Sequence, residues 1–497
     1  MSTVDTNTRR ESSYNISPKF PCQNRSPSST VPPRRRFRWV VNASLPLALA
    51  IGAAIFVLLP ALLPSDGRLA LFTLILAAIL WSTTSIDPAY VALASVMLLV
   101  VTGSTTQEQL FASLASDVVW LTIGAFILGG AVQKTGLAVR LTRLVVARSK
   151  TVGSLFWLLT GALIPLSFLI PSTSARAAVT IPVFQSITRA AGDKRITRAL
   201  ALLIPTIILV STIVSLVGAG SHFVANDLLE QIAGKGISFT EWAIYGLPFG
   251  IVASYLSCWV IMSLFLNKSI LDRPLSIATA KQKPLSSAEW KTIIIVVIIL
   301  ILWFTENWHG LKIATISVFG ALLLTLPNFG VFSWKEGIKA VSWNLVIFVG
   351  SAVVLGRTLI NSGAAQWIIE RIFVASGIVN AGSPFPILLF LAFICLTSHL
   401  YVTSHTARTA ALVPALLYLA SSLQLDPVAV LFISIVGMDY CLTFPVSSKA
   451  LLIFTQIEGT TYQPADLLRL SSVMLLVHFG LILLFYYTYW HWIGLAL

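Results

Sequence analysis

Apolar runs long enough to cross a lipid bilayer follow one another along most of the chain. A spanning helix needs about 20 predominantly apolar residues, and runs such as Val40–Leu59 and Trp242–Leu266 reach that length. Because lipid offers no partner to backbone polar groups, these runs predict helices. We expect about 11 transmembrane helices, at residues 40–60, 68–85, 88–104, 118–136, 199–232, 242–266, 291–305, 311–327, 344–362, 428–455 and 468–490.

Two further apolar stretches, at residues 152–188 and 384–420, are interrupted in the middle by hydroxyl side chains and an arginine. The first contains IPSTSARAAVTIP at Ile170–Pro182, and the second contains VTSHTARTAALVP at Val402–Pro414. Apolar residues flank PSTSAR directly, without the Asp, Lys or Gly of an ordinary loop. We therefore predict two re-entrant helical hairpins with tips at the bilayer midplane, where irregular backbone is tolerated only inside protein or along a cavity.

The chain contains an internal duplication, because three blocks recur in the same order. Trp120–Leu137 resembles Asn344–Ala364, the two interrupted motifs align without a gap, and Gly236–Pro248 weakly resembles Thr460–Ser472. Basic residues flank the first interrupted stretch on both sides, whereas the segments around the second carry Arg371 alone. By the positive-inside rule the first flanks are cytoplasmic and the second are external, so the repeats are inverted. Inverted repeats with broken elements near the midplane are typical of secondary transporters.

Polar segments mark the boundaries between the parts of the chain. The chain has a net charge of +14, and part of this charge lies in the segment PPRRRFR before the first apolar run. We expect these arginines to hold the N-terminus in the cytoplasm rather than to bind nucleic acid. The count of spans then places the C-terminus outside the cell. We divide the chain into a disordered basic cytoplasmic tail (1–38), a first membrane half (39–266) with the inner hairpin 152–188, a cytoplasmic linker (267–290) and a second membrane half (291–497) with the outer hairpin 384–420.

Composition narrows the class of protein. The 497 residues are 56% hydrophobic and 10% charged, with a mean hydropathy of +0.87, whereas roughly a quarter of the residues in a soluble domain are charged. The sequence contains no H-E-x-x-H motif and no Walker loop, so we expect neither an enzyme nor a primary pump. The cysteines are widely spaced and predict neither a metal site nor a disulfide framework: Cys22, Cys258, Cys395 and Cys441.

The hairpin tips carry the candidate binding chemistry. At each tip, hydroxyls and an arginine begin a helix, where unpaired N–H groups and the helix dipole favour an anion. An arginine at bilayer depth is costly unless it is paired, so its repetition at matched positions indicates a function, and two such clusters suit a divalent anion. The alternative is that the hydroxyls satisfy the backbone or pack at helix crossings. The predicted site comprises Ser172, Thr173, Ser174, Arg176, Ser404, His405, Thr406 and Arg408, completed by Gly220, Ser447, Ser448 and Lys449.

The span after each hairpin is also broken, by Gly218 and Gly220 in the first copy and by Pro445 in the second. Glycine and proline at these depths unwind helices and free carbonyls for cations. Asp439 and Lys449 either neutralise each other or act separately. His222 and His405 either carry protons or are hydrogen-bonded in the core, and His405, which lies in the tip, is the better candidate for a proton carrier.

These residues resemble the divalent-anion:sodium symporter (DASS) family over nearly the whole chain after the tail. That family carries an S-N-T triplet at each of two hairpin tips, where this chain has Ser172-Thr173-Ser174 and Ser404-His405-Thr406. PSTSARAAVTIP is especially close to the P-S-N-T-A-R version of bacterial citrate and tartrate exchangers and plastid 2-oxoglutarate/malate carriers. The resemblance implies the DASS fold, a homodimer, and an elevator motion that carries dicarboxylates, citrate, tartrate, sulfate or similar anions.

The sequence departs from the family pattern in two places. Thr173 and His405 replace the tip asparagines, and the G-T-P-P-N run of sodium-coupled members is missing from the broken spans. The resemblance implies a Na⁺ near Ser172, Gly218 and Ser404, while a nearby Arg or Lys could supply the same positive charge. The coupling ion is therefore Na⁺ or H⁺, and no other cofactor is expected.

The sequence as a whole predicts a secondary active transporter in the plasma or inner membrane. It would move di- or tricarboxylates, or similar divalent anions, by symport or exchange. Its expected partners are the small anion, the lipid bilayer and a second copy of the chain. The alternative is a cation/proton antiporter or an arsenite-type carrier, which would need acidic residues at the midplane, and Asp227 and Asp439 are the candidates.

Overall fold

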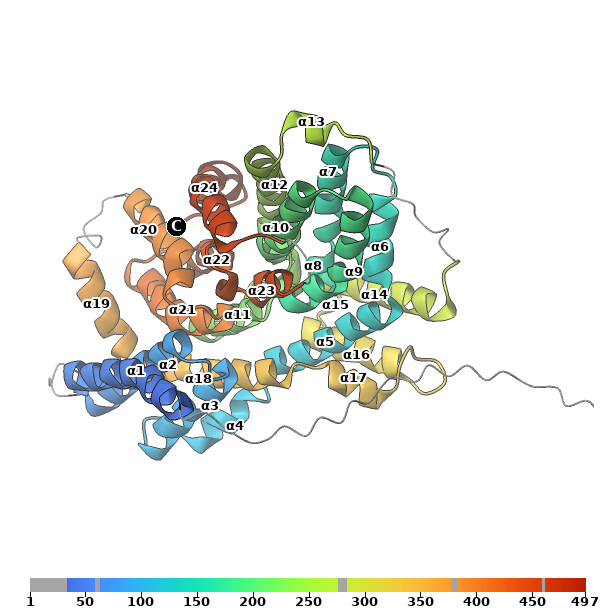
Figure 1. Cartoon of the computed structure of the whole chain (residues 1–497). Coiled ribbons are helices and arrows are strands. Elements are labelled where there is room, and N and C mark those ends of the chain that lie inside the picture. Colours follow the sequence, from blue (N-terminus) through green and yellow to red (C-terminus); the bar gives the residue numbers. More distant parts are fainter. Residues whose placement is uncertain (1–33, 59–62, 276–283, 377–382, 458–460) are drawn as a thin grey trace, which may run out of the picture. The chain divides into compact units, whose positions relative to one another are not determined.

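The structure is a computed structural model that describes residues 34–58, 63–275, 284–376, 383–457 and 461–497. Residues Leu45–Leu497 form one compact unit, and every site discussed below lies within it. Across the described residues the secondary structure is helical, apart from one antiparallel bridge between Thr151 and Pro274 (Figure 1). This confirms the predicted all-α class.

The elements fall into two halves along the chain. The first half contains α1 (Arg34–Leu58), α2 (Ser65–Thr83), α3 (Pro88–Val101), α4 (Gln107–Ser113), α5 (Asp117–Thr135), α6 (Leu137–Val146), α7 (Val152–Leu163), α8 (Leu166–Leu169), α9 (Thr173–Ala191), α10 (Lys194–Val210), the short 3-10 helices η1 (Ser211–Val214) and η2 (Leu216–Gly218), α11 (Gly220–Ala233), α12 (Phe239–Phe265) and α13 (Lys268–Leu271). The second half contains α14 (Ser287–Phe304), α15 (Glu306–His309), α16 (Ile313–Thr325), α17 (Trp334–Ala340), α18 (Trp343–Asn361), α19 (Ala364–Ser376), α20 (Pro384–Thr397), η4 (Ser398–Leu400), α21 (His405–Ser422), α22 (Pro427–Asp439), η5 (Pro445–Ser447), α23 (Lys449–Thr455), α24 (Pro464–Phe485) and the π-helical turn η6 (Tyr486–Trp490).

Eight helical segments within the described residues are long and apolar enough to cross a membrane. Shorter apolar helices accompany them, at Ser44–Leu58, Pro88–Val101, Ile313–Thr325, Pro384–Leu400 and Pro427–Asp439. The chain is therefore a multi-pass membrane protein, and the total of about 11 spans stays a prediction.

The same order of elements occurs twice, as the internal duplication predicts. The first half contains, in order, a long helix (α5), a short helix (α6), an interrupted pair (α7 and α8, then α9), a broken helix (α10, then α11) and a second long helix (α12). The second half repeats this order with the long helix α18, the short helix α19, the interrupted pair α20 and α21, the broken helix α22 and α23, and the long helix α24. Helices α6 and α19 are not among the predicted elements: they are shorter than a span and follow the glycines Gly136 and Gly363, both with positive φ.

Three sequence-based boundaries differ from the structure. The first helix already begins at Arg34, so the last residues of the predicted tail are helical, while residues 1–33 lie outside the described part of the chain. The predicted linker 267–290 contains α13 and the start of α14, and its residues 276–283 also lie outside the description. The predicted span 199–232 begins at Lys194, where Asp193 caps α10, and consists of two helices separated by η1 and η2.

The break in this span requires a glycine. A Cβ atom built on Gly218 would lie 2.1 Å from the carbonyl oxygen of Thr212, which is far closer than any van der Waals contact. The same residue ends η2, immediately before α11 begins at Gly220. The backbone can therefore turn back on itself here only because Gly218 has no side chain.

Replacing Gly218 by alanine is expected to lower the thermal stability of the purified protein, because the added methyl group forces the break apart. Overpacking of this kind costs about 1–3 kcal/mol. Gly480 on α24 is the matched control: a Cβ there meets no atom within 4 Å, so Gly480→Ala should leave the unfolding temperature unchanged or raise it. Equal unfolding temperatures for Gly218→Ala and the wild type in the same detergent would contradict this account.

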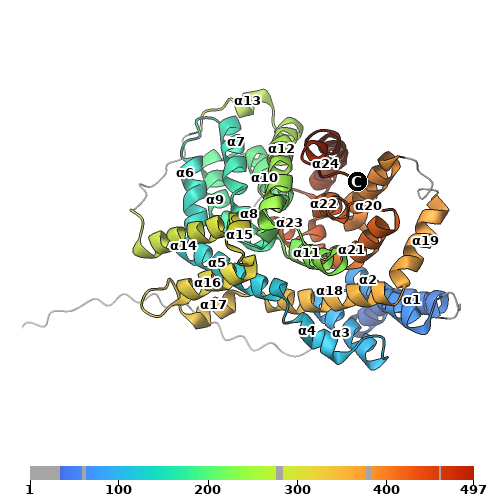
Figure 2. The same cartoon turned by 180° about the vertical axis from the view of Figure 1, so that it is seen from behind.

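The second arm of each interrupted pair packs on a helix from the other half. Helix α9 packs against α10 of its own half and against α23, while α21 packs against α18 and α22 of its own half and against α11 (Figure 1). The rear view shows the same neighbours (Figure 2). Of the eight segments long enough to cross a membrane, the one formed by α10 and η1 is the most buried inside the protein. In its 18-residue apolar stretch 89% of the residues are buried, compared with 22% in that of α14. The two tips and the two broken spans thus belong to one packed region.

Candidate functional site

The first hairpin tip is a short break between α8 and α9. Ser172 is the N-cap of α9, with an extended backbone, and its Oγ accepts a hydrogen bond from the backbone N–H of Ala175 at 3.3 Å. The Ser172 and Ser174 hydroxyls lie 3.1 Å apart, and both residues are half-buried. The Ser172 hydroxyl therefore caps the helix that begins at the tip, and both serines stay partly accessible.

The second tip repeats this geometry. Ser404 is the N-cap of α21, its Oγ accepts from the backbone N–H of Ala407 at 3.4 Å, and its hydroxyl lies 3.3 Å from that of Thr406. Ser404, His405 and Thr406 are half-buried. The two tips thus offer matched hydroxyls at the N-termini of two helices of similar length.

Both arginines lie in the first turns of the helices that follow the tips, where the sequence places them. Both guanidinium groups are fully buried and bind the backbone next to the helix breaks, instead of lining the accessible part of the tips. Arg176 donates to the Gly218 carbonyl at 2.7 Å and to the Thr212 hydroxyl at 3.2 Å, and it also contacts the Ser167 hydroxyl. Burial at this depth is tolerated because a guanidinium can satisfy the carbonyls that an interrupted helix leaves free.

Arg408 has the corresponding role in the second copy. It donates to the carbonyl of Val402, which precedes its own tip, at 3.1 Å, and to the carbonyl of Met438, near the end of α22, at 2.9 Å. Each arginine therefore ties a hairpin tip to the broken span that follows it. Both guanidinium groups are inaccessible to solvent, whereas the tip hydroxyls are half-buried.

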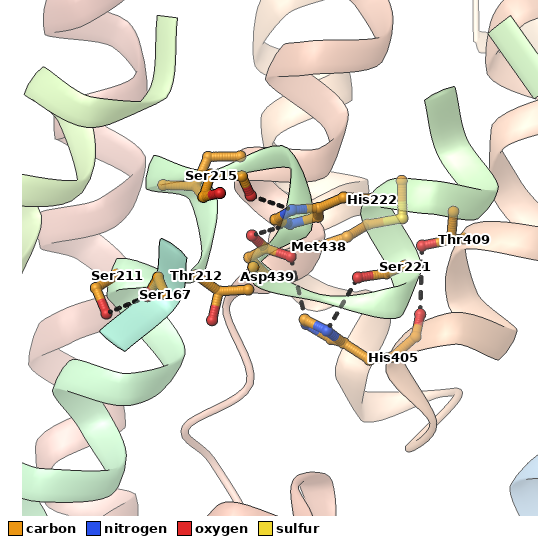
Figure 3. Close-up of polar contacts among 12 residues, drawn as sticks. Ser167, Ser211, Thr212, Ser215, Ser221, His222, His405, Thr409, Met438 and Asp439 are labelled. Atoms are coloured by element: carbon orange, nitrogen blue, oxygen red, sulfur yellow. Dashed lines mark hydrogen bonds and ion pairs between the residues drawn. The ribbon is translucent and has the colours of Figure 1, made fainter. Parts of the chain in front are cut away.

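A chain of buried polar contacts connects the two halves between the breaks (Figure 3). His222 on α11 lies with its Nδ1 3.0 Å from the Ser215 carbonyl and its Nε2 2.9 Å from Asp439 Oδ2. The other carboxylate oxygen of Asp439, Oδ1, lies 3.6 Å from His405 Nε2 in the second tip. His405 Nδ1 in turn lies 3.4 Å from the Ser221 hydroxyl. Three titratable residues from α11, α22 and α21 thus lie in one row.

The remaining predicted site residues divide into three groups. Gly220 is buried, and a Cβ there would lie 2.6 Å from Leu345, so it gives close packing. Ser447 is buried, and Ser448 caps α23 by accepting from Ala450 N–H at 3.2 Å. Lys449 is exposed. The suggested neutralisation of Asp439 by Lys449 is wrong, because Asp439 pairs with the histidines and the break at Pro445 separates the lysine from it.

Sequence reasoning missed the side chains that support the tips from behind. Ser167 contacts Arg176 and lies 3.3 Å from the Ser211 hydroxyl, whereas His399, at the matching position before the second tip, lies with Nε2 2.6 Å from the Thr443 hydroxyl. The gapless alignment of the two copies, extended upstream, pairs Ser167 with His399, and this pairing is the sequence signal that identifies both as candidate site residues.

The three residues expected near a Na⁺, Ser172, Gly218 and Ser404, can be compared with the geometry. No cluster of three or more His, Cys, Asp or Glu side chains that could hold a metal ion occurs within the described ranges. The Gly218 carbonyl, one of the positions expected near a Na⁺, already accepts from Arg176. A second cation at that oxygen would lie beside a buried guanidinium, which is electrostatically unfavourable. Ser172 and Ser404 keep lone pairs beyond the bonds that cap their helices.

Comparisons with known proteins agree on one group. The family described as "Sodium:sulfate symporter transmembrane region" matches residues 40–496. A "Membrane protein" of Cupriavidus necator is 27% identical over 67% of this chain, which spans 66% of that relative, just under two thirds of its length. The "Citrate/succinate antiporter" of Escherichia coli K12 is 24% identical over 75% of this chain and 78% of its own. The "Sodium-dependent dicarboxylate transporter SdcS" of Staphylococcus saprophyticus is 24% identical over 82% of this chain and 84% of its own.

A solved structure shares the fold. The YdaH transporter of Alcanivorax borkumensis superimposes with a TM-score of 0.56 at 13% sequence identity, covering 85% of this chain and 98% of the other. At this identity the likeness concerns the fold alone. The family match, which spans almost the whole described region, carries the assignment. The chain is therefore a member of the sodium:sulfate symporter family, the divalent-anion:sodium symporters whose tip motifs its sequence resembles.

Proposed function

We propose that this protein is a secondary active transporter that carries a di- or tricarboxylate, or a similar divalent anion, by symport or exchange. The observation that supports the proposal best is the matched pair of tips: α9 and α21 each begin with half-buried hydroxyls and have a fully buried arginine one turn later. The named relatives, a citrate/succinate antiporter and a sodium-dependent dicarboxylate transporter, point to the same class of substrate.

The anion would bind to the tips through hydrogen bonds. The first-turn N–H groups of α9 and α21 that the cap hydroxyls leave free can donate to carboxylate oxygens. The tip hydroxyls can donate as well: Ser172, Thr173, Ser174, Ser404 and Thr406. The positive charges of Arg176 and Arg408 act on the anion from behind, through a region with little water to screen them. The exposed Lys449 at the start of α23 would complete the site, together with Ser448, which caps this helix, and Ser447 of η5.

The packing supports an elevator motion of the hairpins together with the broken spans. The buried arginines bind each tip to the break that follows it, and α9 with α23 and α21 with α11 join the two halves. A unit connected in this way would move as one body against the remaining helices. We propose further that the protein is a homodimer in the plasma or inner membrane, with its N-terminus in the cytoplasm, its C-terminus outside and the linker 267–290 in the cytoplasm.

Uptake into proteoliposomes tests this proposal. Radiolabelled succinate, citrate and sulfate are offered to the purified protein, with and without a Na⁺ gradient and a pH gradient. We expect saturable uptake of at least one divalent or trivalent anion driven by a gradient of Na⁺, H⁺ or a second anion. Accumulation of arsenite or exchange of cations in place of these anions would instead support the alternative carrier function.

Replacing a cap serine is expected to weaken transport more than it weakens folding. Ser172→Ala and Ser404→Ala each remove a hydroxyl that caps a helix, at a cost of about 1 kcal/mol, and remove a donor that faces the anion. We expect the KM for the transported anion to rise roughly ten- to a hundredfold, since hydrogen bonds to charged groups contribute about 1.5–3 kcal/mol. Ser472→Ala on α24, an exposed serine bonded to its own helix, is the matched control. Wild-type KM values in both tip variants would exclude the tips as the binding site.

A further inference from the structure

His222 is surrounded by hydrogen-bond acceptors at both of its ring nitrogens. Nδ1 faces a backbone carbonyl, that of Ser215, at 3.0 Å, and Nε2 faces the carboxylate of Asp439 at 2.9 Å (Figure 3). A carbonyl oxygen only accepts hydrogen bonds, and so does an ionised carboxylate, while a neutral imidazole has one N–H and one lone pair. With a neutral histidine and an ionised aspartate, one of these two short contacts would bring lone pairs together.

Two arrangements of protons satisfy both contacts. In one, His222 is an imidazolium that donates from both nitrogens. In the other, His222 donates from Nδ1, and a protonated Asp439 donates from Oδ2 to Nε2. Both place one more proton on the pair than a neutral histidine and an ionised aspartate carry. His222 is fully buried and Asp439 almost so, so no solvent can satisfy the contacts instead.

The electrostatic surroundings make this proton relevant to an anion. The titratable and charged groups that act on the pair are Arg176 from α9, His405 and Arg408 from α21, Cys441 after α22 and His478 on α24. The indole ring of Trp242 on α12 packs against the His222 ring, with 4.8 Å between the two ring centroids. The two buried arginines and the ionised Asp439 together leave a single positive charge. One proton on the pair raises the total to two, which matches a divalent anion.

The carboxylate also connects the pair to the second tip. Asp439 Oδ1 and His405 Nε2 face each other at 3.6 Å, and neither has a hydrogen-bond partner among the described residues. A change in the charge of the pair therefore acts directly on the tip that would hold the anion. The Gly218 carbonyl, in contrast, is occupied by Arg176, which leaves the proton as the cation best accommodated between the breaks.

We propose that His222 and Asp439 together bind one proton and that this proton travels with the transported anion. The location of the proton follows from the hydrogen-bond geometry alone, whereas its transport rests on the proposed function. The pair then takes the part that Na⁺ has in sodium-coupled relatives: it brings a positive charge into the membrane together with the substrate.

Spectroscopy on the wild-type protein tests the proton site without any substrate. The full-length protein, with ¹⁵N-labelled histidine, is examined in lipid at neutral pH by solid-state NMR, and its carboxyl bands are recorded by infrared spectroscopy. We expect either a doubly protonated imidazole signal that disappears in His222→Gln or a protonated carboxyl band that disappears in Asp439→Asn. A spectrum with neither feature would overturn the proposal.

Calorimetric titration with succinate, from neutral to alkaline pH, tests the coupling. If one proton binds with the anion, the affinity should fall by about tenfold for each pH unit once the pair has lost its proton. His222→Gln and Asp439→Asn should each bind with an affinity that does not depend on pH. Asp227→Asn is the matched control, since Asp227 is a buried acid on α11 that contacts Gln231 instead, and it should keep the wild-type pH dependence.

The outcomes separate this inference from the proposed function. Tight binding of succinate that does not change with pH in the wild type would overturn proton coupling and leave the transporter intact. Loss of the pH dependence in Asp227→Asn would show that the linkage does not belong to the His222–Asp439 pair. If succinate, citrate and sulfate all fail to bind, the proposed function fails, and the NMR and infrared measurements still decide whether the pair holds a proton.

Discussion

Arg176→Ala is expected to reduce anion uptake to background and to lower the unfolding temperature of the purified protein. The substitution leaves the Gly218 carbonyl without its partner at a depth that water does not reach, and it empties the volume of a large, fully buried side chain. A buried carbonyl without a partner costs about 1–3 kcal/mol, and the cavity adds to this, so we expect a loss of about 2–4 kcal/mol. Removing the charge also removes attraction for the anion.

Thermal unfolding in detergent and uptake into proteoliposomes measure the two effects on the same preparation. Arg176→Lys should lie between the alanine variant and the wild type, because an ammonium can bond to one of the oxygens that the planar guanidinium reaches together. Arg143→Ala, which changes an exposed arginine on α6, should behave as the wild type in both assays. Normal uptake by Arg176→Ala would show that transport needs neither the hydrogen bonds of Arg176 to the broken span nor its positive charge.

Trp242→Ala is expected to destabilise the protein most strongly of the substitutions considered. The Trp242 side chain is fully buried, its Nε1 donates to the Ile213 carbonyl at 3.0 Å, and its ring contacts both His222 and Phe432. Truncating a buried tryptophan costs about 3–5 kcal/mol through lost burial and the remaining cavity. The carbonyl beside the first break also loses its donor, so transport should fall along with stability.

A phenylalanine at this position separates the two contributions. Trp242→Phe keeps a ring over His222 and loses the N–H, so it should recover most of the stability while the Ile213 carbonyl stays unpaired. Trp308→Ala is the control, since Trp308 is 88% exposed on α15 and its removal should leave the unfolding temperature within the error of the measurement. If Trp242→Ala unfolds at the same temperature as Trp308→Ala, the contacts of Trp242 contribute nothing to stability.

The sequence was sufficient to predict the tips and the breaks, because both are local features that occur twice. Ser172 and Ser404 precede helices in the structure, as N-caps with the hydroxyls that the motif predicts. Gly218 and Pro445 likewise mark breaks, since the backbone conformations that these residues favour are encoded within a few positions of the chain. The internal duplication strengthened each of these predictions with a second, independent example.

The partners of the buried charges could not be predicted in the same way. The helical period places Arg176 one turn after Ser172. The direction of the Arg176 side chain, however, depends on its hydrogen bond to the Gly218 carbonyl, which belongs to a separate span. His222 and Asp439 come from opposite halves of the chain, and their contact arises only when α11 and α22 pack together. Asp439 and Lys449 are close in sequence, and a break between them is enough to part them.

The exchange of partners between the two halves also has a consequence for how the protein is made. Helix α9 emerges from the ribosome long before α23, against which it packs, and α11 emerges long before α21. A nascent chain that ends before Lys449 therefore carries the helix α9 without α23, the helix from the second half against which it packs. The first half can therefore reach its final packing only after the second half has been synthesised.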